Sequence, residues 1–134
     1  MSERNKAHIR RLIEEVYNKG DLDAVAEVAS PDLVIHSASG EIRGHAGARE
    51  YVAALRAGFP NLAITVEDQV AEGDMVATRW VARGTHRGAF QGVPATGRDV
   101  VMTGTDIDRI AGGKVAECWA QVDVLGLMRQ LGAA

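Results

Sequence analysis

The sequence of 134 residues predicts an α+β fold, in which three N-terminal helices pack on a curved, mostly antiparallel sheet. Apolar residues recur at helical spacing through the first half of the chain, whereas they alternate with polar residues through the second half. Short turns join the alternating segments in hairpin order. No stretch rich in proline, glycine and serine divides the sequence, so we expect one domain over residues 1–134.

Three helices are expected in the first half of the chain, over residues 5–19, 22–29 and 44–58. In the first helix, Ile9, Leu12, Ile13 and Val16 follow the i, i+3, i+4, i+7 spacing of an amphipathic helix. The second helix stops before Pro31, because the residue that precedes a proline disfavours the helical conformation. A short strand over residues 33–37 separates the second helix from the third.

Four strands in hairpin order are expected in the second half, over residues 62–70, 75–86, 98–110 and 114–124. Two of the turns between them contain the glycines that tight turns favour, Gly73 in one and Gly112 with Gly113 in the other. Residues 125–131 then predict one or two helical turns.

The composition excludes several classes of protein. A net charge of −3 and a pI near 5.8 give no basic surface for nucleic acid or for an anionic membrane, so neither partner is expected. One cysteine, Cys118, cannot form an internal disulfide, and four scattered histidines offer little to a metal, so no metal and no cofactor are expected. The charged N-terminus has no apolar segment behind it that resembles a signal peptide, so a cytoplasmic location is expected.

Four short motifs carry a resemblance to a known family: YNKGD at residues 17–21, GTHRG at 84–88, PATGR at 94–98 and GKVAECW at 113–119. With the order of the elements, they resemble the SnoaL-like polyketide cyclase family of the nuclear transport factor 2-like superfamily, over almost the whole chain. The resemblance implies a cone in which helices and a curved sheet enclose an apolar pocket. The motifs are specific for the family and weak for the reaction, because one fold can support many functions.

Asp106 is the strongest candidate for a catalytic residue. It follows Val100, Met102 and Gly104 along one face of its expected strand. An aspartate on such a face should be protonated, paired or directed into a cavity. In the family it resembles, an aspartate inside the pocket acts as the acid and base, and in ketosteroid isomerase the matching carboxylic acid stabilises an enolate. The alternative is a surface aspartate paired with a nearby arginine.

His86 is the second catalytic candidate. Strand alternation places it on the same face as Trp80, and its titration near neutral pH suits proton transfer or polarisation of a carbonyl. We expect it to approach Asp106 across the cavity, so that the two groups titrate as a pair. The alternative is a histidine that only hydrogen-bonds the loop behind it.

The loop that follows His86, over residues 86–98, is expected to cross the mouth of the pocket as a rim and lid, with Phe90 and Pro94 over the opening. An ordinary long hairpin loop is the alternative. The residues expected to contact a substrate are His36, Trp80, Phe90, Val100, Met102 and Cys118. A structural histidine and a buried small hydrophobe are the alternatives for His36 and Cys118.

The sequence lacks catalytic residues of two enzymes of the same superfamily, ketosteroid isomerase and limonene epoxide hydrolase. Counting from Gly20 and Asp21, the base of ketosteroid isomerase falls at Ser37, and the second aspartate of limonene epoxide hydrolase falls near Ala120. Steroid isomerisation by that base is therefore not supported, and epoxide hydrolysis becomes less favoured.

The leading hypothesis is a small, cofactor-independent enzyme that uses general acid/base catalysis on an apolar molecule bearing carbonyl groups, as in an aldol-type ring closure or an isomerisation. A protein that binds an apolar metabolite without converting it, and an accessory protein of polyketide hydroxylation, are the alternatives. We expect a four-stranded open sheet with helices on one face. Its other face, which carries Arg79, Val81, Trp119 and Gln121, needs cover, so a homodimer through that face is expected. Trp119 and Asp123, which match the family pattern, are assigned structural or dimer roles.

Overall fold

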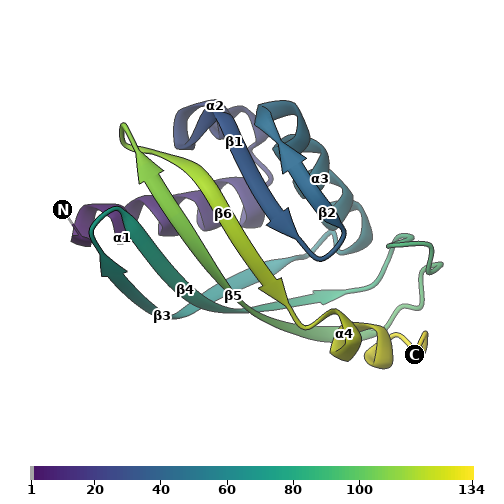
Figure 1. Cartoon of the computed structure of the whole chain (residues 1–134). Coiled ribbons are helices and arrows are strands. Elements are labelled where there is room, and N and C mark those ends of the chain that lie inside the picture. Colours follow the sequence, from purple (N-terminus) through teal and green to yellow (C-terminus); the bar gives the residue numbers. More distant parts are fainter. Residues whose placement is uncertain (1) are drawn as a thin grey trace.

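The computed structural model describes residues 2–134 and confirms the α+β class (Figure 1). The helical elements are α1 (Ser2–Arg11), η1 (Leu12–Asn18), η2 (Leu22–Ala24), α2 (Val25–Val28), α3 (Gly44–Gly58) and α4 (Val124–Gln130). The strands are β1 (Ala29–Ser37), β2 (Gly40–Arg43), β3 (Ala63–Glu72), β4 (Met75–Thr85), β5 (Asp99–Ala111) and β6 (Lys114–Val122). One curved sheet in the order β2-β1-β6-β5-β4-β3 contains all six strands.

Strands β3 to β6 form the predicted antiparallel meander, but the expectation of a four-stranded sheet is wrong. Strand β1 joins β6 in parallel, with Ile35 opposite Cys118, and β2 pairs with β1 as a hairpin. A parallel neighbour from the start of the chain leaves no local signal in the sequence, and the four residues of β2 are too few to show an alternation. The two additional strands extend the sheet beside β6 and form one side of the concave face.

The first two helices differ from their predicted bounds. The first continues from α1 into η1, where a wider turn brings the Lys19 N–H to the Glu14 carbonyl at 3.1 Å. The second ends at Val28, because Ala29 adopts the extended conformation (φ −118°, ψ 144°) and begins β1. Helix α3 has the predicted bounds, and it packs with α1 and η1 on one face of the sheet (Figure 1).

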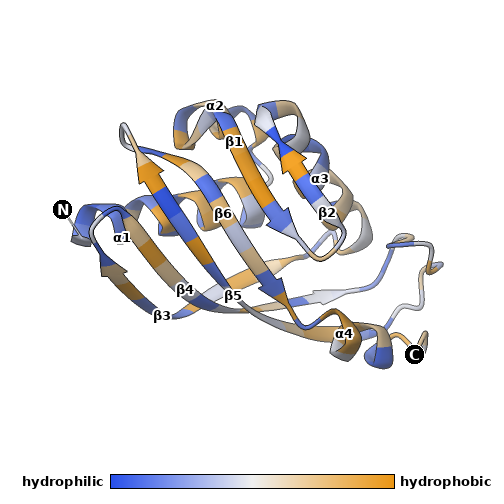
Figure 2. Ribbon diagram, viewed as in Figure 1, coloured by the Kyte–Doolittle hydropathy of each residue, from blue (hydrophilic) through white to orange (hydrophobic). Residues whose placement is uncertain are grey.

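The alternation of hydrophilic and hydrophobic residues along the strands gives the sheet one apolar face (Figure 2). Two clusters of buried side chains form on that face. One lies beneath the N-terminal helices and includes Ile9, Val16, Val52, Val76 and Val115. The other lies near α4 and includes Phe59, Ala82, Val100, Met102 and Leu127. Residues of both clusters line a cavity that neither fills.

Within residues 2–134, no helix is long and apolar enough to cross a membrane.

Candidate functional site

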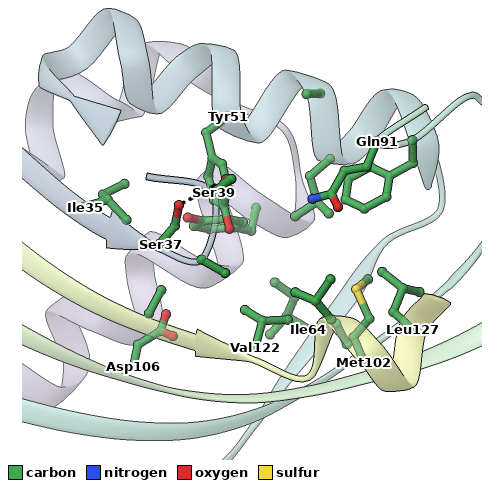
Figure 3. A pocket seen from close by; sticks show the side chains of 18 of the residues that line it. Ile35, Ser37, Ser39, Tyr51, Ile64, Gln91, Met102, Asp106, Val122 and Leu127 are labelled. Carbon is green, nitrogen blue, oxygen red and sulfur yellow. Dashed lines mark hydrogen bonds between the residues drawn. The ribbon is translucent and has the colours of Figure 1, made fainter. Parts of the chain in front are cut away.

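A cavity of about 650 Å³ opens on the concave side of the sheet, between the helices and strands β3 to β6. This volume lies within the range of pockets that bind small molecules. Most of the wall is apolar, with side chains from η1, α3, α4 and the sheet that include Ile13, Leu55, Ile64, Met102 and Leu127 (Figure 3). The cavity therefore suits a molecule with a large hydrocarbon surface.

A few polar side chains interrupt the apolar wall. Asp106 extends from β5 into the cavity, and Tyr51 extends towards it from α3 on the opposite side (Figure 3). Ser37 and Ser39 form a second polar group near the β1–β2 turn, where their hydroxyl oxygens lie 3.2 Å apart. Gln91 contributes an amide from the loop over residues 86–98. The cavity can therefore orient polar groups of a ligand at several points.

Burial raises the pKa of Asp106 from its ordinary value of 3.8 to about 6. The neighbouring Trp80 indole and the Gln121 backbone amide favour the ionised form and limit this rise. Oδ1 of Asp106 is buried and has no hydrogen-bond partner among residues 2–134. A carboxyl in this environment exchanges protons near neutral pH, and one of its oxygens is not engaged by another described residue.

Gly104 creates the space that brings Trp80 beside Asp106. Trp80 and Gly104 face each other on β4 and β5. A Cβ atom at position 104 would lie 2.8 Å from Cε2 of Trp80 and 2.7 Å from the Gln121 carbonyl oxygen. Only glycine therefore lets the indole lie across β5 without displacing it.

Tyr17 and Tyr51 remain protonated at neutral pH. Burial, together with the charge of Asp106, raises the pKa of Tyr51 to about 12, and burial raises the pKa of Tyr17 well above its ordinary value. Both side chains line the cavity, Tyr17 from η1 and Tyr51 from α3. They can donate hydrogen bonds to a carbonyl or enolate oxygen.

His86 does not line the cavity. Its ring is fully buried against Phe59, with 5.5 Å between the ring centroids, and its Nδ1 accepts the Thr96 N–H at 3.2 Å. Asp106 lies opposite Thr78 on β4, eight residues before His86, a separation of roughly 25 Å along the strand. This geometry fits the alternative in which His86 anchors the loop behind it, and it gives no support to a coupled pair with Asp106.

Two other predicted contact residues lie away from the cavity wall. His36 points to the opposite sheet face, where its ring stacks on Trp119 and lies 2.7 Å from a carboxylate oxygen of Glu117. Val100 is 2% exposed and packs in the cluster near α4. By contrast Trp80, Phe90, Met102 and Cys118 all line the cavity, and their contact with a substrate stays a prediction.

The loop over residues 86–98 forms part of the cavity wall through Ala89, Phe90 and Gln91, whereas Pro94 is not among the lining residues. The N–H groups of Arg87 and Gly88 both donate to the Gly58 carbonyl, at 3.0 and 3.2 Å, and hold the loop to the end of α3. The loop is therefore tied to the helix at the edge of the cavity.

Our reading of the sequence missed three residues of this region. Tyr17 continues the apolar stripe of the first helix, four residues after Ile13, and this spacing could have revealed it. Tyr51 shares the inner side of α3 with Ala48, Val52 and Leu55. Asp108 lies on the same face of β5 as Asp106, and alternation could have identified it as a buried carboxyl.

Residues 2–134 contain no group of three or more His, Cys, Asp or Glu side chains placed to hold a metal ion. Activity without a cofactor stays a prediction.

The fold therefore encloses an apolar cavity between helices and a curved sheet, and one carboxyl, that of Asp106, lies on the cavity wall. Residues 7–131 match the SnoaL-like polyketide cyclase family, and the chain belongs to that family. A polyketide cyclase-like function is therefore supported for it.

Named relatives span nearly the whole chain. The chain is 33% identical over 130 residues to the aklanonic acid methyl ester cyclase DnrD of Streptomyces peucetius. The match covers 92% of this chain and 88% of DnrD. The structure of IdmH from Streptomyces antibioticus, provisionally assigned as a polyketide cyclase, is 38% identical, with a TM-score of 0.82 over 96% of this chain and 98% of IdmH. AclR from Streptomyces galilaeus, provisionally assigned as a hydroxylase, is 30% identical, with a TM-score of 0.88 over 100% of this chain and 99% of AclR.

Proposed function

We propose that the protein catalyses an aldol-type ring closure of a neutral, polyketide-like molecule, with Asp106 as the group that accepts and returns the proton. The observation that carries the proposal is a single carboxyl, Asp106, on the wall of an apolar cavity, where burial raises its pKa to about 6. At neutral pH most of this carboxyl is ionised, yet it is a stronger base than an exposed aspartate.

In the proposed reaction, the Asp106 carboxylate removes a proton from the carbon next to a carbonyl, and the C–H electron pair forms an enolate. The enolate carbon then attacks a second carbonyl carbon of the same molecule, which forms the C–C bond of the ring and leaves an alkoxide. The alkoxide takes the proton from Asp106, so the carboxylate is restored and no oxidant or reductant is used. Every step is a proton transfer or an addition, which general acid/base catalysis accelerates.

The hydroxyl of Tyr51 is the proposed donor to the enolate oxygen. It enters the cavity from the helix opposite Asp106, and its raised pKa keeps the proton on the phenol throughout the reaction. Donors aimed at the oxygen where charge develops stabilise a transition state more than the ground state.

The charge of the cavity supports a neutral substrate. No lysine, arginine or histidine of the described chain lines it, and Asp106 is its one acidic group. A free carboxylate bound there would be desolvated without a cation and close to Asp106, which is unfavourable. We therefore propose a substrate whose acid groups are masked, as in the methyl ester that appears in the name of DnrD.

The test is turnover of linear diketone esters by the wild type and by Asp106→Asn, with Asp74→Asn as the matched control. Asp74 lies exposed in the turn between β3 and β4, so its substitution removes a carboxylate that faces solvent. We expect Asp106→Asn to lower kcat at least ~100-fold and Asp74→Asn to leave it unchanged. If Asp106→Asn binds the ester and cyclises it at the wild-type rate, the proposed mechanism is wrong.

A second candidate function is assistance to hydroxylation of a polyketide, because the fold matches that of AclR closely. Mass spectrometry of the product separates the two reactions. An aldol closure is an isomerisation and leaves the mass unchanged, whereas hydroxylation adds one oxygen atom.

We also propose that the protein forms a homodimer through the sheet face opposite the cavity. Large apolar side chains are exposed there, with Trp119 at 37%, Ile107 at 42% and Val101 at 43%. Burial of such a surface against a second copy would remove apolar area from water. Sedimentation at micromolar concentration should give a species of twice the chain mass, and a monomer would contradict this proposal.

A further inference from the structure

A second, smaller cavity of about 50 Å³ lies deeper in the core, beneath the N-terminal helices. Its wall shares Asp106, Tyr17 and Cys118 with the main cavity, whereas Asp108 and Thr78 line the inner cavity alone. Asp106 is therefore in contact with both spaces, one that can hold a substrate and one that contains a second carboxyl.

Asp108 is an acidic side chain that has no basic partner among residues 2–134. It is 3% exposed and lies on the same face of β5 as Asp106, so their Cα atoms are about 7 Å apart. Within residues 2–134, no lysine, arginine or histidine lines either cavity. The adjacent Arg109 lies on the other face of the strand, where its guanidinium is 3.4 Å from Glu117.

The two carboxyls give up their protons in separate steps. Burial, and to a smaller extent the charge of Asp106, raise the pKa of Asp108 to about 7, and a hydrogen bond with the Cys118 thiol limits this rise. For Asp106 burial alone raises the pKa, to about 6. Asp106 therefore ionises first, and Asp108 ionises in the presence of that charge.

The other titratable groups around the pair stay neutral in this pH range. They are Tyr17 from η1, Tyr51 from α3 and Cys118 from β6, and burial raises the pKa of each. The remaining polar side chains beside the pair, Trp80 and Thr78 from β4, carry no charge. Between pH 6 and pH 8, the charge near Asp106 therefore changes because Asp108 ionises.

We propose that Asp108 is a positioning residue that acts on Asp106 electrostatically: when Asp108 ionises inside the core, its negative charge makes Asp106 a stronger base towards the substrate. This inference rests on the proposed role of Asp106. Proton transfer from substrate to Asp106 neutralises the carboxylate nearest to Asp108 and moves the negative charge to the enolate in the outer cavity. The repulsion between the two carboxylates is relieved by this transfer, which lowers the barrier.

The predicted signature is a two-step pH profile. In the wild type, kcat/KM rises as Asp106 ionises near pH 6 and rises again as Asp108 ionises near pH 7. In Asp108→Asn only the first step remains. We expect the ratio of wild-type to variant kcat/KM to grow about 5- to 10-fold between pH 6 and pH 8, for one added charge at about 7 Å.

Asp74→Asn is measured alongside and should follow the wild-type profile. A purely structural role for Asp108 would lower activity by the same factor at every pH, and this result would overturn the inference. If Asp106→Asn is fully active, the proposed function is wrong, and the inference that rests on it is wrong as well. If Asp106→Asn is inactive but Asp108→Asn keeps both steps, the inference alone is wrong.

Carbon-13 NMR of the aspartate carboxyls provides a second measurement that does not depend on how Asp108→Asn folds. We expect the Asp108 carboxyl of the wild type to titrate near neutral pH, and its pKa to fall in Asp106→Asn because the neighbouring charge is lost. Titration of Asp108 below pH 5, or a pKa that is the same in both proteins, would overturn the inference.

Discussion

Replacement of Asp108 by asparagine should make the stability of the protein less sensitive to pH. The pKa of Asp108 is higher in the folded chain than its ordinary value of 3.8, so the folded state binds this proton more tightly than the unfolded state. Below pH 3.8 the carboxyl is protonated in both states and has no effect. As the pH rises from 3.8 to about 7, the unfolded state ionises more readily and the free energy of unfolding falls.

The size of this loss follows from the difference in pKa. A rise from 3.8 to about 7 corresponds to about 4 kcal/mol, at roughly 1.4 kcal/mol for each pH unit. The side chain is almost fully buried, so solvent screens little of this effect. The full loss is reached at about pH 7 and above. It is a large part of the 5–15 kcal/mol by which an ordinary domain is stable.

Asparagine cannot ionise, so the variant lacks this pH-dependent loss. We expect the free energy of unfolding of Asp108→Asn, relative to the wild type, to increase by about 4 kcal/mol between pH 4 and pH 8. Urea denaturation at both pH values measures it, with Asp74→Asn as the control that should track the wild type. A difference between variant and wild type that is constant across pH would refute the reasoning.

Three further substitutions test single features of the structure. Gly104→Ala should reduce stability by about 1–3 kcal/mol in thermal unfolding, because its methyl group would overlap Trp80. Asp123→Ala should cost about 1 kcal/mol in the same assay, since Asp123 accepts the Gly126 N–H at 2.8 Å and caps α4. Phe90→Ala should raise KM about tenfold with a smaller change in kcat in steady-state assays, because it removes apolar wall from the cavity; an unchanged KM would exclude Phe90 from the binding surface.

The meander and the position of Asp106 could be predicted because both depend on local patterns. Alternation along β5 identified the face of Asp106, and the hairpin turns at Gly73 and Gly112 set the order of the strands. The pairing of β1 with β6 joins residues more than 80 positions apart, so no local pattern encodes it.

The position of His86 relative to the cavity could not be predicted in the same way. Alternation says which face of a strand a side chain occupies, but it does not say how far along the strand the cavity extends. His86 shares the face of Trp80 and lies beyond the end of the cavity wall, where Thr96 and Phe59 enclose it. The same is true of Asp108 at the other end of this face. Alternation places it on the face of Asp106, but it does not show that Asp108 lines the small inner cavity and not the main one.

The most direct test of the central claim is exchange of hydrogen for deuterium at the carbon next to a carbonyl. The probe is a neutral aryl ketone that can form an enolate but has no second carbonyl to attack, incubated in D₂O and followed by proton NMR. If Asp106 is the base, the wild type exchanges these hydrogens increasingly above pH 6, and Asp106→Asn exchanges them at least ~100-fold more slowly. Equal rates for the wild type and Asp106→Asn, with the ketone bound to both, would contradict the account.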